Sequence, residues 1–135
     1  LSQAQLGAAQ IEPGLNSAYD VLATGEPDRE KLTKLRWQAG YDLAMGRILA
    51  AKSRVEGYNA MLAALKRGKS FENEGSTRWV LTPAVETEAG SAVKKIGERA
   101  VEYLERVKAE HEGTPWAQMA EMELQVPVGW KWVEQ

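Results

Sequence analysis

Apolar residues recur at steps of three and four along most of this 135-residue chain, which is the spacing of helices with one buried face. The longest such series runs over residues 28–66, and we expect it to form one long helix or two helices separated at a glycine. The candidate break points are Gly40, Gly46 and Gly57. The apolar face alternates steps of four and three, as in a heptad seam, which predicts lengthwise packing against other helices. The seam consists of Trp37, Tyr41, Ala44, Ile48, Ala51, Val55, Tyr58, Leu62 and Leu65.

The chain before this series also favours helix, with two interruptions. Residues 3–11 are rich in Gln, Ala and Leu, but Pro13 and Gly14 follow. We therefore expect the first helix to be kinked or broken there. Pro27 suits the first position of the second helix, after a turn at residues 25–28.

The stretch from residue 91 to residue 124 predicts two helices joined by a tight turn. Its first half repeats apolar residues at helical spacing, and Gly113 then ends the helix. Thr114 is a good cap and Pro115 fits the first position of the next helix, so the two helices form an αα-hairpin. The apolar positions of the first helix are Val93, Ile96, Ala100, Tyr103, Leu104 and Val107.

Residues 67–91 change to loop chemistry, with Gly, Ser, Asn and Glu around one short apolar run. Such a long connection is uncommon inside a compact domain unless it has structure of its own. We expect residues 78–81 to lie extended across the helices and the tip of the loop to be disordered. The tail after Leu124 is too interrupted for a helix and too aromatic for a solvated end, so it is expected to pack back on the domain. Trp130 and Trp132 face the same side if this tail is extended.

Composition narrows the class of protein. Hydrophobic residues make up 44% of the chain and charged residues 27%, which is typical of a soluble globular domain. The net charge of -2 predicts no nucleic-acid partner, and no apolar run reaches the roughly 20 residues of a membrane span. Cysteine is absent, which excludes disulfides and thiolate chemistry and leaves the compartment open. We expect a single helical domain over residues 1–135. Because the chain begins without methionine, we also expect this domain to belong to a larger protein.

No catalytic, cofactor-binding or metal-binding constellation is apparent, so the chain is not expected to be an enzyme or to need a cofactor. His111 is the only histidine, and its position predicts a residue at the end of a helix that interacts with the negative end of the dipole. The carboxylate pairs Glu121 with Glu123 and Glu86 with Glu88 lack the glycine and Asp/Asn spacing of calcium loops, so they are expected to be solvated. Asp42 lies within the long helix and is expected to pair with an arginine or lysine of a neighbouring helix, which fixes helix register.

Tryptophan is enriched in the energetically dominant parts of protein interfaces. We therefore propose Trp79, Trp130 and Trp132 as candidate partner-binding residues. Trp37 and Trp116 are expected to fill the core instead.

The turn of the predicted hairpin resembles a tetratricopeptide-type junction, where the second helix of one repeat passes into the first helix of the next. Glu112 stands where that turn often has proline, and no second copy appears at a period of about 34 residues. We therefore do not expect a regular peptide-binding superhelix. The resemblance rests on EHEGTPWA at residues 110–117, on Ala100, Leu104 and Val107 before it, and on Ala120 and Leu124 after it.

A broader resemblance is to the helical region found beside von Willebrand factor A-type domains in some bacterial proteins. It rests on RWQAGYDLAMGRILAAKSRVEGYNAML at residues 36–62, TRWVLTP at 77–83, and EHEGTPWAQMAEMEL with a closing VGWKWVE. This resemblance implies a helical neighbour of another domain. The chain itself has no Asp-x-Ser-x-Ser metal motif, so a metal-dependent adhesion site would lie elsewhere.

The sequence thus predicts an all-α fold, with a four- to five-helix bundle or tetratricopeptide-like helical hairpins and a long loop at residues 67–91. The expected role is a non-catalytic scaffold or protein-interaction module of a larger bacterial protein. Its partner is then a protein or a neighbouring domain. The alternative is a self-associating structural domain, in which the long helix forms a homodimer through its seam.

Overall fold

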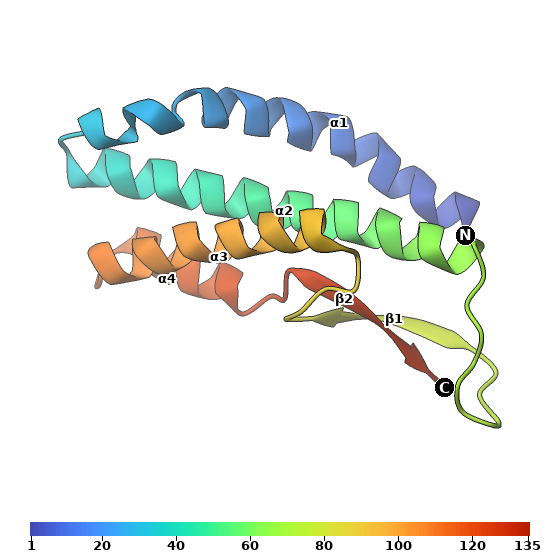
Figure 1. Cartoon of the computed structure of the whole chain (residues 1–135). Helices are drawn as coiled ribbons and strands as arrows, with labels where there is room; N and C mark the ends of the chain where they lie inside the picture. The colour runs from blue at the N-terminus through green and yellow to red at the C-terminus, as the bar shows by residue number, and fades with distance from the viewer.

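The computed structural model describes residues 1–135 and is mostly helical, with five helices and one two-stranded sheet (Figure 1). The predicted predominance of helix is confirmed, whereas the prediction of a strictly all-α fold is wrong. In chain order the elements are α1 (Ser2–Thr24), the 3₁₀ helix η1 (Glu26–Lys31), α2 (Leu35–Lys66), β1 (Trp79–Ala84), α3 (Ser91–Glu110), α4 (Pro115–Leu124) and β2 (Gly129–Glu134).

The sheet forms because two short segments of aromatic and β-branched residues pair antiparallel, with Leu81 opposite Trp132. β1 lies inside the predicted long loop and β2 in the predicted extended tail. Arg78 and Gln135 exchange both backbone hydrogen bonds at 3.0 Å, so Pro83 falls at a position that faces the outer edge of β1. Its missing N–H therefore removes no bond between the strands.

The helix α2 lies between α1 and α3, and the sheet crosses below the C-terminal half of α2 (Figure 1). Two buried clusters fill the space between α2 and α3, and α4 closes the second one. The first cluster contains Met45, Leu49, Ala50, Ala100 and Tyr103, and the second contains Leu43, Leu104, Val107 and Ala120. The fully buried face of α2 therefore differs from the predicted seam: of the nine seam residues only Leu62 is buried, Trp37 is exposed, and the other seven are partly buried.

α2 runs unbroken through its three glycines, so residues 35–66 form one helix, whereas residues 28–31 belong to η1. A Cβ atom on Gly46 would lie 2.7 Å from Leu104, and one on Gly57 would lie 3.1 Å from Trp130. These glycines are points of close approach and not breaks. The break comes earlier, at Leu32, whose ψ of 110° separates η1 from α2.

α1 also continues through Pro13, so the prediction of a broken first helix is wrong. Pro13 removes one backbone hydrogen bond, to the carbonyl of Ala9. Both residues are exposed, so water solvates the freed carbonyl and the helix continues.

The αα-hairpin is confirmed in detail. Gly113 adopts a φ of +77° after α3, and the Thr114 hydroxyl oxygen accepts the backbone N–H of Ala117 at 3.3 Å. Pro115 is the first residue of α4. The local residues of this turn alone specify its geometry.

The two tryptophans expected in the core differ in position. Trp116 is half-buried against the second cluster. Trp37 is 56% exposed, which corrects its prediction as a core residue. It lies in the first turn of α2, before the first buried residue, Ala39, and the Arg36 guanidinium covers its ring at 4.9 Å.

Candidate functional site

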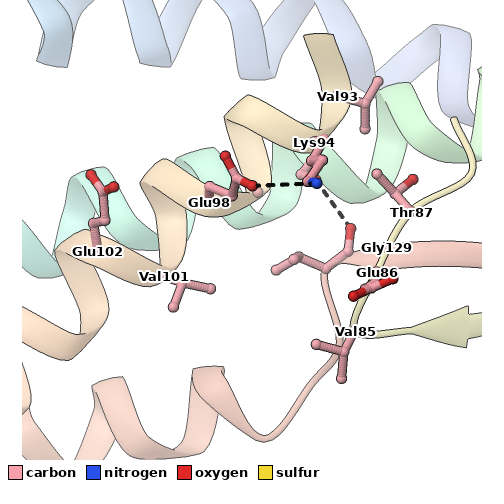
Figure 2. A pocket seen from close by; sticks show the side chains of 12 residues that line it. Val85, Glu86, Thr87, Val93, Lys94, Glu98, Val101, Glu102 and Gly129 are labelled. Carbon is pink, nitrogen blue, oxygen red and sulfur yellow. Dashed lines mark hydrogen bonds and ion pairs between the residues drawn. The ribbon is translucent and has the colours of Figure 1, made fainter. Parts of the chain in front are cut away.

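A hollow of about 490 Å³ opens between α3 and the residues that follow β1 and precede β2 (Figure 2). A narrower cavity of about 80 Å³ continues from it toward α4 and shares three of its valines. We call this combined surface the valine groove. Its apolar lining includes Val85, Val93, Val101, Val126 and Val128, and its charged residues are Glu86, Lys94, Glu98, Glu102 and Glu123.

The helix α3 forms one wall because it has two different faces. Ala100 and Leu104 are buried against α2. Val101 lies outside that buried stripe and remains 37% exposed, between the exposed side chains of Glu98 and Glu102. In Figure 2 the Val101 side chain points from α3 toward Val85, whereas Glu98 and Glu102 extend from the upper side of the helix; all three line the hollow.

The floor of the groove is set by a close approach at Gly97. A Cβ atom there would lie 3.0 Å from Val128 Cγ2 and 3.1 Å from Ser53 Oγ. Glycine therefore lets the segment before β2 lie directly on α3. The Ser53 hydroxyl donates a hydrogen bond to the Val128 carbonyl at 3.1 Å, which holds this segment against α2.

The opposite wall depends on Gly129. A Cβ atom on this residue would lie 2.6 Å from the backbone oxygen of Glu86. The chain after β1 therefore passes tightly over the start of β2 only because residue 129 has no side chain. Val85 projects from this crossing and is 84% exposed at the mouth of the groove.

Arg54 of α2 fixes the connection between α4 and β2. Its guanidinium donates to the carbonyl oxygens of Pro127 at 3.1 Å and Val126 at 2.9 Å, and to the Glu123 carboxylate at 2.6 Å. The Trp130 indole in turn donates to the Arg54 carbonyl at 2.9 Å. The groove therefore rests on a backbone that is bound to α2 at several points.

The rim of the groove is negatively charged. Lys94 is the only cation among the lining residues, and its Nζ lies 3.9 Å from Glu98 Oε1. Both side chains are exposed, so this pair contributes little. Glu86 and Glu102 form no ion pair. Glu123 is already bound by Arg54, so the charge that faces solvent comes from the other three carboxylates.

The tryptophans proposed as partner-binding residues lie together on the sheet, outside the valine groove. Trp130 packs edge-on against Tyr58 of α2, with ring centroids 5.7 Å apart. Trp79 stacks on Phe71 at 5.3 Å and meets the edge of Trp132 at 6.5 Å. The tail therefore packs back on the domain as predicted. The partner-binding role of the tryptophans stays a prediction.

Trp79 and Trp132 also line a second hollow, of about 410 Å³, on the sheet. Their indole N–H groups are buried and have no hydrogen-bond acceptor. The Lys69 ammonium lies 4.6 Å from the centre of the Trp79 ring. The loop over this hollow is held by Glu134, whose carboxylate accepts the backbone N–H groups of Glu72 and Asn73 at 2.6 and 3.0 Å.

A dense group of charged residues lies at the other end of the bundle. Asp42 is fully buried and accepts hydrogen bonds from Arg29 at 3.1 and 2.6 Å, and Arg106 of α3 lies 3.5 Å from it. The predicted pairing of Asp42 with a neighbouring helix is confirmed. Arg29 also binds Glu110 at 3.2 Å, which links η1 to α2 and α3.

The second half of this charged group surrounds Glu26. Its carboxylate accepts the hydroxyl of Tyr103 at 2.5 Å and the guanidinium of Arg99 at 2.9 Å. The Tyr103 hydrogen bond, followed by the charge of Arg99, lowers the pKa of Glu26 below its ordinary value. Burial, followed by the same hydrogen bond, raises the pKa of Tyr103. Every charged group here has a partner of opposite charge, which is typical of ion pairs that hold helices together.

His111 lies at the C-terminal end of α3, as predicted, and its Nε2 atom is buried without a hydrogen-bond partner.

No three His, Cys, Asp or Glu side chains gather closely enough to hold a metal ion. None of the helices has the length and hydropathy needed to cross a membrane.

The valine groove was not predicted from the sequence. One signal for its first wall does exist: Val101 is an apolar residue directly beside the buried stripe of α3, between two glutamates. Val85 and Val128 carry no such signal, because only the pairing of β1 with β2 brings them to the same surface.

No protein-family model, curated protein or solved structure matches this chain.

Proposed function

We propose that this chain is a non-catalytic helical interaction module of a larger bacterial protein, and that the valine groove is its docking site. One observation carries this proposal. Val85 is 84% exposed at the mouth of an apolar hollow, beside the partly exposed Val101. Exposed apolar side chains gathered around a concave surface are typical of interaction sites.

The fixed walls of the groove support this proposal. Ser53 and Arg54 hold the segment before β2 through its carbonyl oxygens, and Gly97 lets the same segment lie on α3. A surface that is already ordered loses less conformational entropy when a partner binds. The groove therefore meets a general requirement of a docking site.

The charged cluster supports a non-catalytic role. It pairs the carboxylates of Glu26, Asp42 and Glu110 with arginine side chains from η1 and α3. Ion pairs of this kind hold helices in register. A general acid or base, in contrast, must be able to reach the proton of a bound substrate.

We also propose which domain lies beside this module in the full-length protein. We infer that the module lies beside a von Willebrand factor A-type domain and that its C-terminal half is tetratricopeptide-like. The capped turn between α3 and α4 supports the second inference. The tryptophans Trp79, Trp130 and Trp132 are retained as a second candidate contact surface, and the buried, unpaired indole N–H groups of Trp79 and Trp132 support this.

Self-association through α2 is the second candidate function. One face of α2 remains partly open, because Ala44, Ile48 and Ala51 line a hollow of about 400 Å³ together with Leu22 of α1. A second copy packed on this face would bury the rest of the predicted seam.

The test is site-specific photo-crosslinking in cells that produce the full-length protein. A photoreactive amino acid replaces Val85 in one variant and Ile48 in a second. A third variant carries it at the exposed control position Glu30. We expect a discrete, heavier adduct from position 85 that disappears when Val101→Ser is added, because this substitution removes part of the apolar wall.

Mass spectrometry of the adducts separates the two functions. Peptides of another protein or another domain at position 85 support docking in the groove. Adducts at position 48 that contain only this chain support self-association. Equal labelling at all three positions, or none at position 85, would contradict the proposed docking function.

A further inference from the structure

We infer that the occupant of the valine groove is a segment whose apolar side chains are flanked by lysine or arginine. This inference rests on the proposed docking function and names the chemistry of the partner. It follows from the way in which apolar and acidic side chains alternate around the groove.

The wall formed by α3 combines both kinds of contact. Glu98 and Glu102 are four residues apart and so lie on the same face of the helix, with Val101 beside them. One ammonium or guanidinium group of a partner can therefore lie near both carboxylates while an adjacent apolar side chain contacts Val101.

The opposite wall repeats the pattern. Glu86 follows Val85 directly, at the crossing over Gly129. An apolar side chain and a carboxylate therefore face the groove from both sides (Figure 2). A segment lying between the walls meets valines at its centre and carboxylates at both edges.

The net negative charge of the groove favours a partner that is positively charged. Lys94 offsets part of the charge of Glu98, whereas Glu86 and Glu102 form no ion pair, and no other cation lines the groove. Like charges brought together at an interface are unfavourable, and opposite charges speed association and fix register. An acidic segment is therefore repelled, a neutral one is bound by the valines alone, and a basic one gains additional attraction.

The test uses three fluorescein-labelled ten-residue peptides as probes. The first alternates leucine with lysine, the second replaces lysine with serine, and the third replaces lysine with glutamate. Binding to the folded chain is followed by fluorescence anisotropy at low and high salt. We expect the lysine peptide to bind most tightly and to weaken as salt is added, because the rim charges are exposed to solvent.

Two double variants make the test specific. In the first, Glu98→Gln is combined with Glu102→Gln, and we expect the affinity for the lysine peptide to fall about fivefold, as two exposed ion pairs are lost. In the second, Glu30→Gln is combined with Glu74→Gln, which removes the same charge at exposed positions outside the groove. This control should bind as the original chain does. Circular dichroism and melting confirm that both variants remain folded.

Three results would overturn the inference. In the first, the serine peptide binds as tightly as the lysine peptide. In the second, both double variants weaken binding equally, which reports only the overall charge of the chain. In the third, none of the peptides binds although position 85 still crosslinks to a partner. In the first and third cases the docking function stands and only the partner chemistry fails. Absence of both binding and crosslinks would refute both proposals.

Discussion

Asp42 and Arg29 form a two-point ion pair, in which the fully buried carboxylate on α2 accepts both Nε and Nη2 of the guanidinium from η1. This pair, together with the bonds of Glu26 to Arg99 and Tyr103, explains why a short 3₁₀ helix with no buried residue of its own stays attached to the bundle. The position of η1 therefore depends on charge and not on apolar packing.

Asp42→Asn should strongly destabilise the fold. The amide keeps the shape of the carboxylate but leaves two guanidinium groups without their buried counter-charge. Breaking a buried pair in this way costs about 3 kcal/mol. Urea unfolding measures the loss, and Asp28→Asn, which breaks only the exposed pair with Lys31, should change stability by less than about 0.5 kcal/mol. Equal effects of the two substitutions would argue that the ion pairs of Asp42 do not stabilise the fold.

Glu26 should contribute to acid sensitivity. Its pKa is lower in the folded chain than its ordinary value, chiefly because of the hydrogen bond from Tyr103. The ionised carboxylate therefore stabilises the fold above its ordinary pKa, and this contribution is lost as pH falls through the lowered value. In melting curves between about pH 6 and about pH 3, Glu26→Gln should flatten the decline in melting temperature.

Tyr103→Phe provides a second test of the same pair, since it removes the donor of the Glu26 hydrogen bond. It should also reduce the loss of stability in acid. Glu30→Gln changes an exposed glutamate that forms no ion pair and should leave the profile unchanged. If all three profiles match that of the original chain, Glu26 does not govern acid unfolding.

Gly46→Ala and Gly40→Ala should have opposite effects, although both lie in α2. A Cβ atom at position 46 would meet the buried Leu104 at 2.7 Å, and the resulting overpacking should lower stability by about 1–2 kcal/mol despite the gain in helix propensity. A Cβ atom at position 40 meets nothing within 4 Å, so alanine should raise stability by up to about 1 kcal/mol. Denaturant midpoints compare the two; stabilisation at both positions would mean that α2 and α3 are not in close contact.

Glu134→Ala should release the loop over the second hollow without unfolding the helices. The carboxylate accepts backbone N–H groups of Glu72 and Asn73, the Asn73 side-chain amide at 2.6 Å and the Ser76 hydroxyl at 3.1 Å. Hydrogen exchange at the amides of residues 72 and 73 should become at least about tenfold faster, while the helical amides keep their protection. Glu74→Ala, in the same loop, serves as the control. Unchanged exchange in Glu134→Ala would show that other contacts hold the loop.

The sequence predicted those elements that depend on neighbouring residues. Gly113, Thr114 and Pro115 define their turn locally, and the structure reproduces it. The sheet was missed because each strand has only six residues and its partner lies beyond two helices. Short apolar runs with proline carry little periodicity, so only the tertiary fold identifies them as strands.

The start of α2 was misplaced for a similar reason. Leu32 is neither glycine nor proline, and nothing in its immediate sequence ends a helix. The bend at Leu32 is accompanied by the contact of Arg29 with Asp42, a contact between elements that sequence patterns do not show. The candidate groove has the same origin, since Val85, Val101 and Val128 come together only in the folded chain.

The pairing of β1 with β2 also links the groove to the completion of folding. α3 and α4 lie between the two strands in the chain, so pairing of the strands closes a long loop that contains the helical hairpin. Val85 and Gly129 lie at the end of this sheet, so the groove is complete only when the two strands have paired. A partner that binds there would recognise only molecules that have finished folding, and its binding would report that assembly is complete.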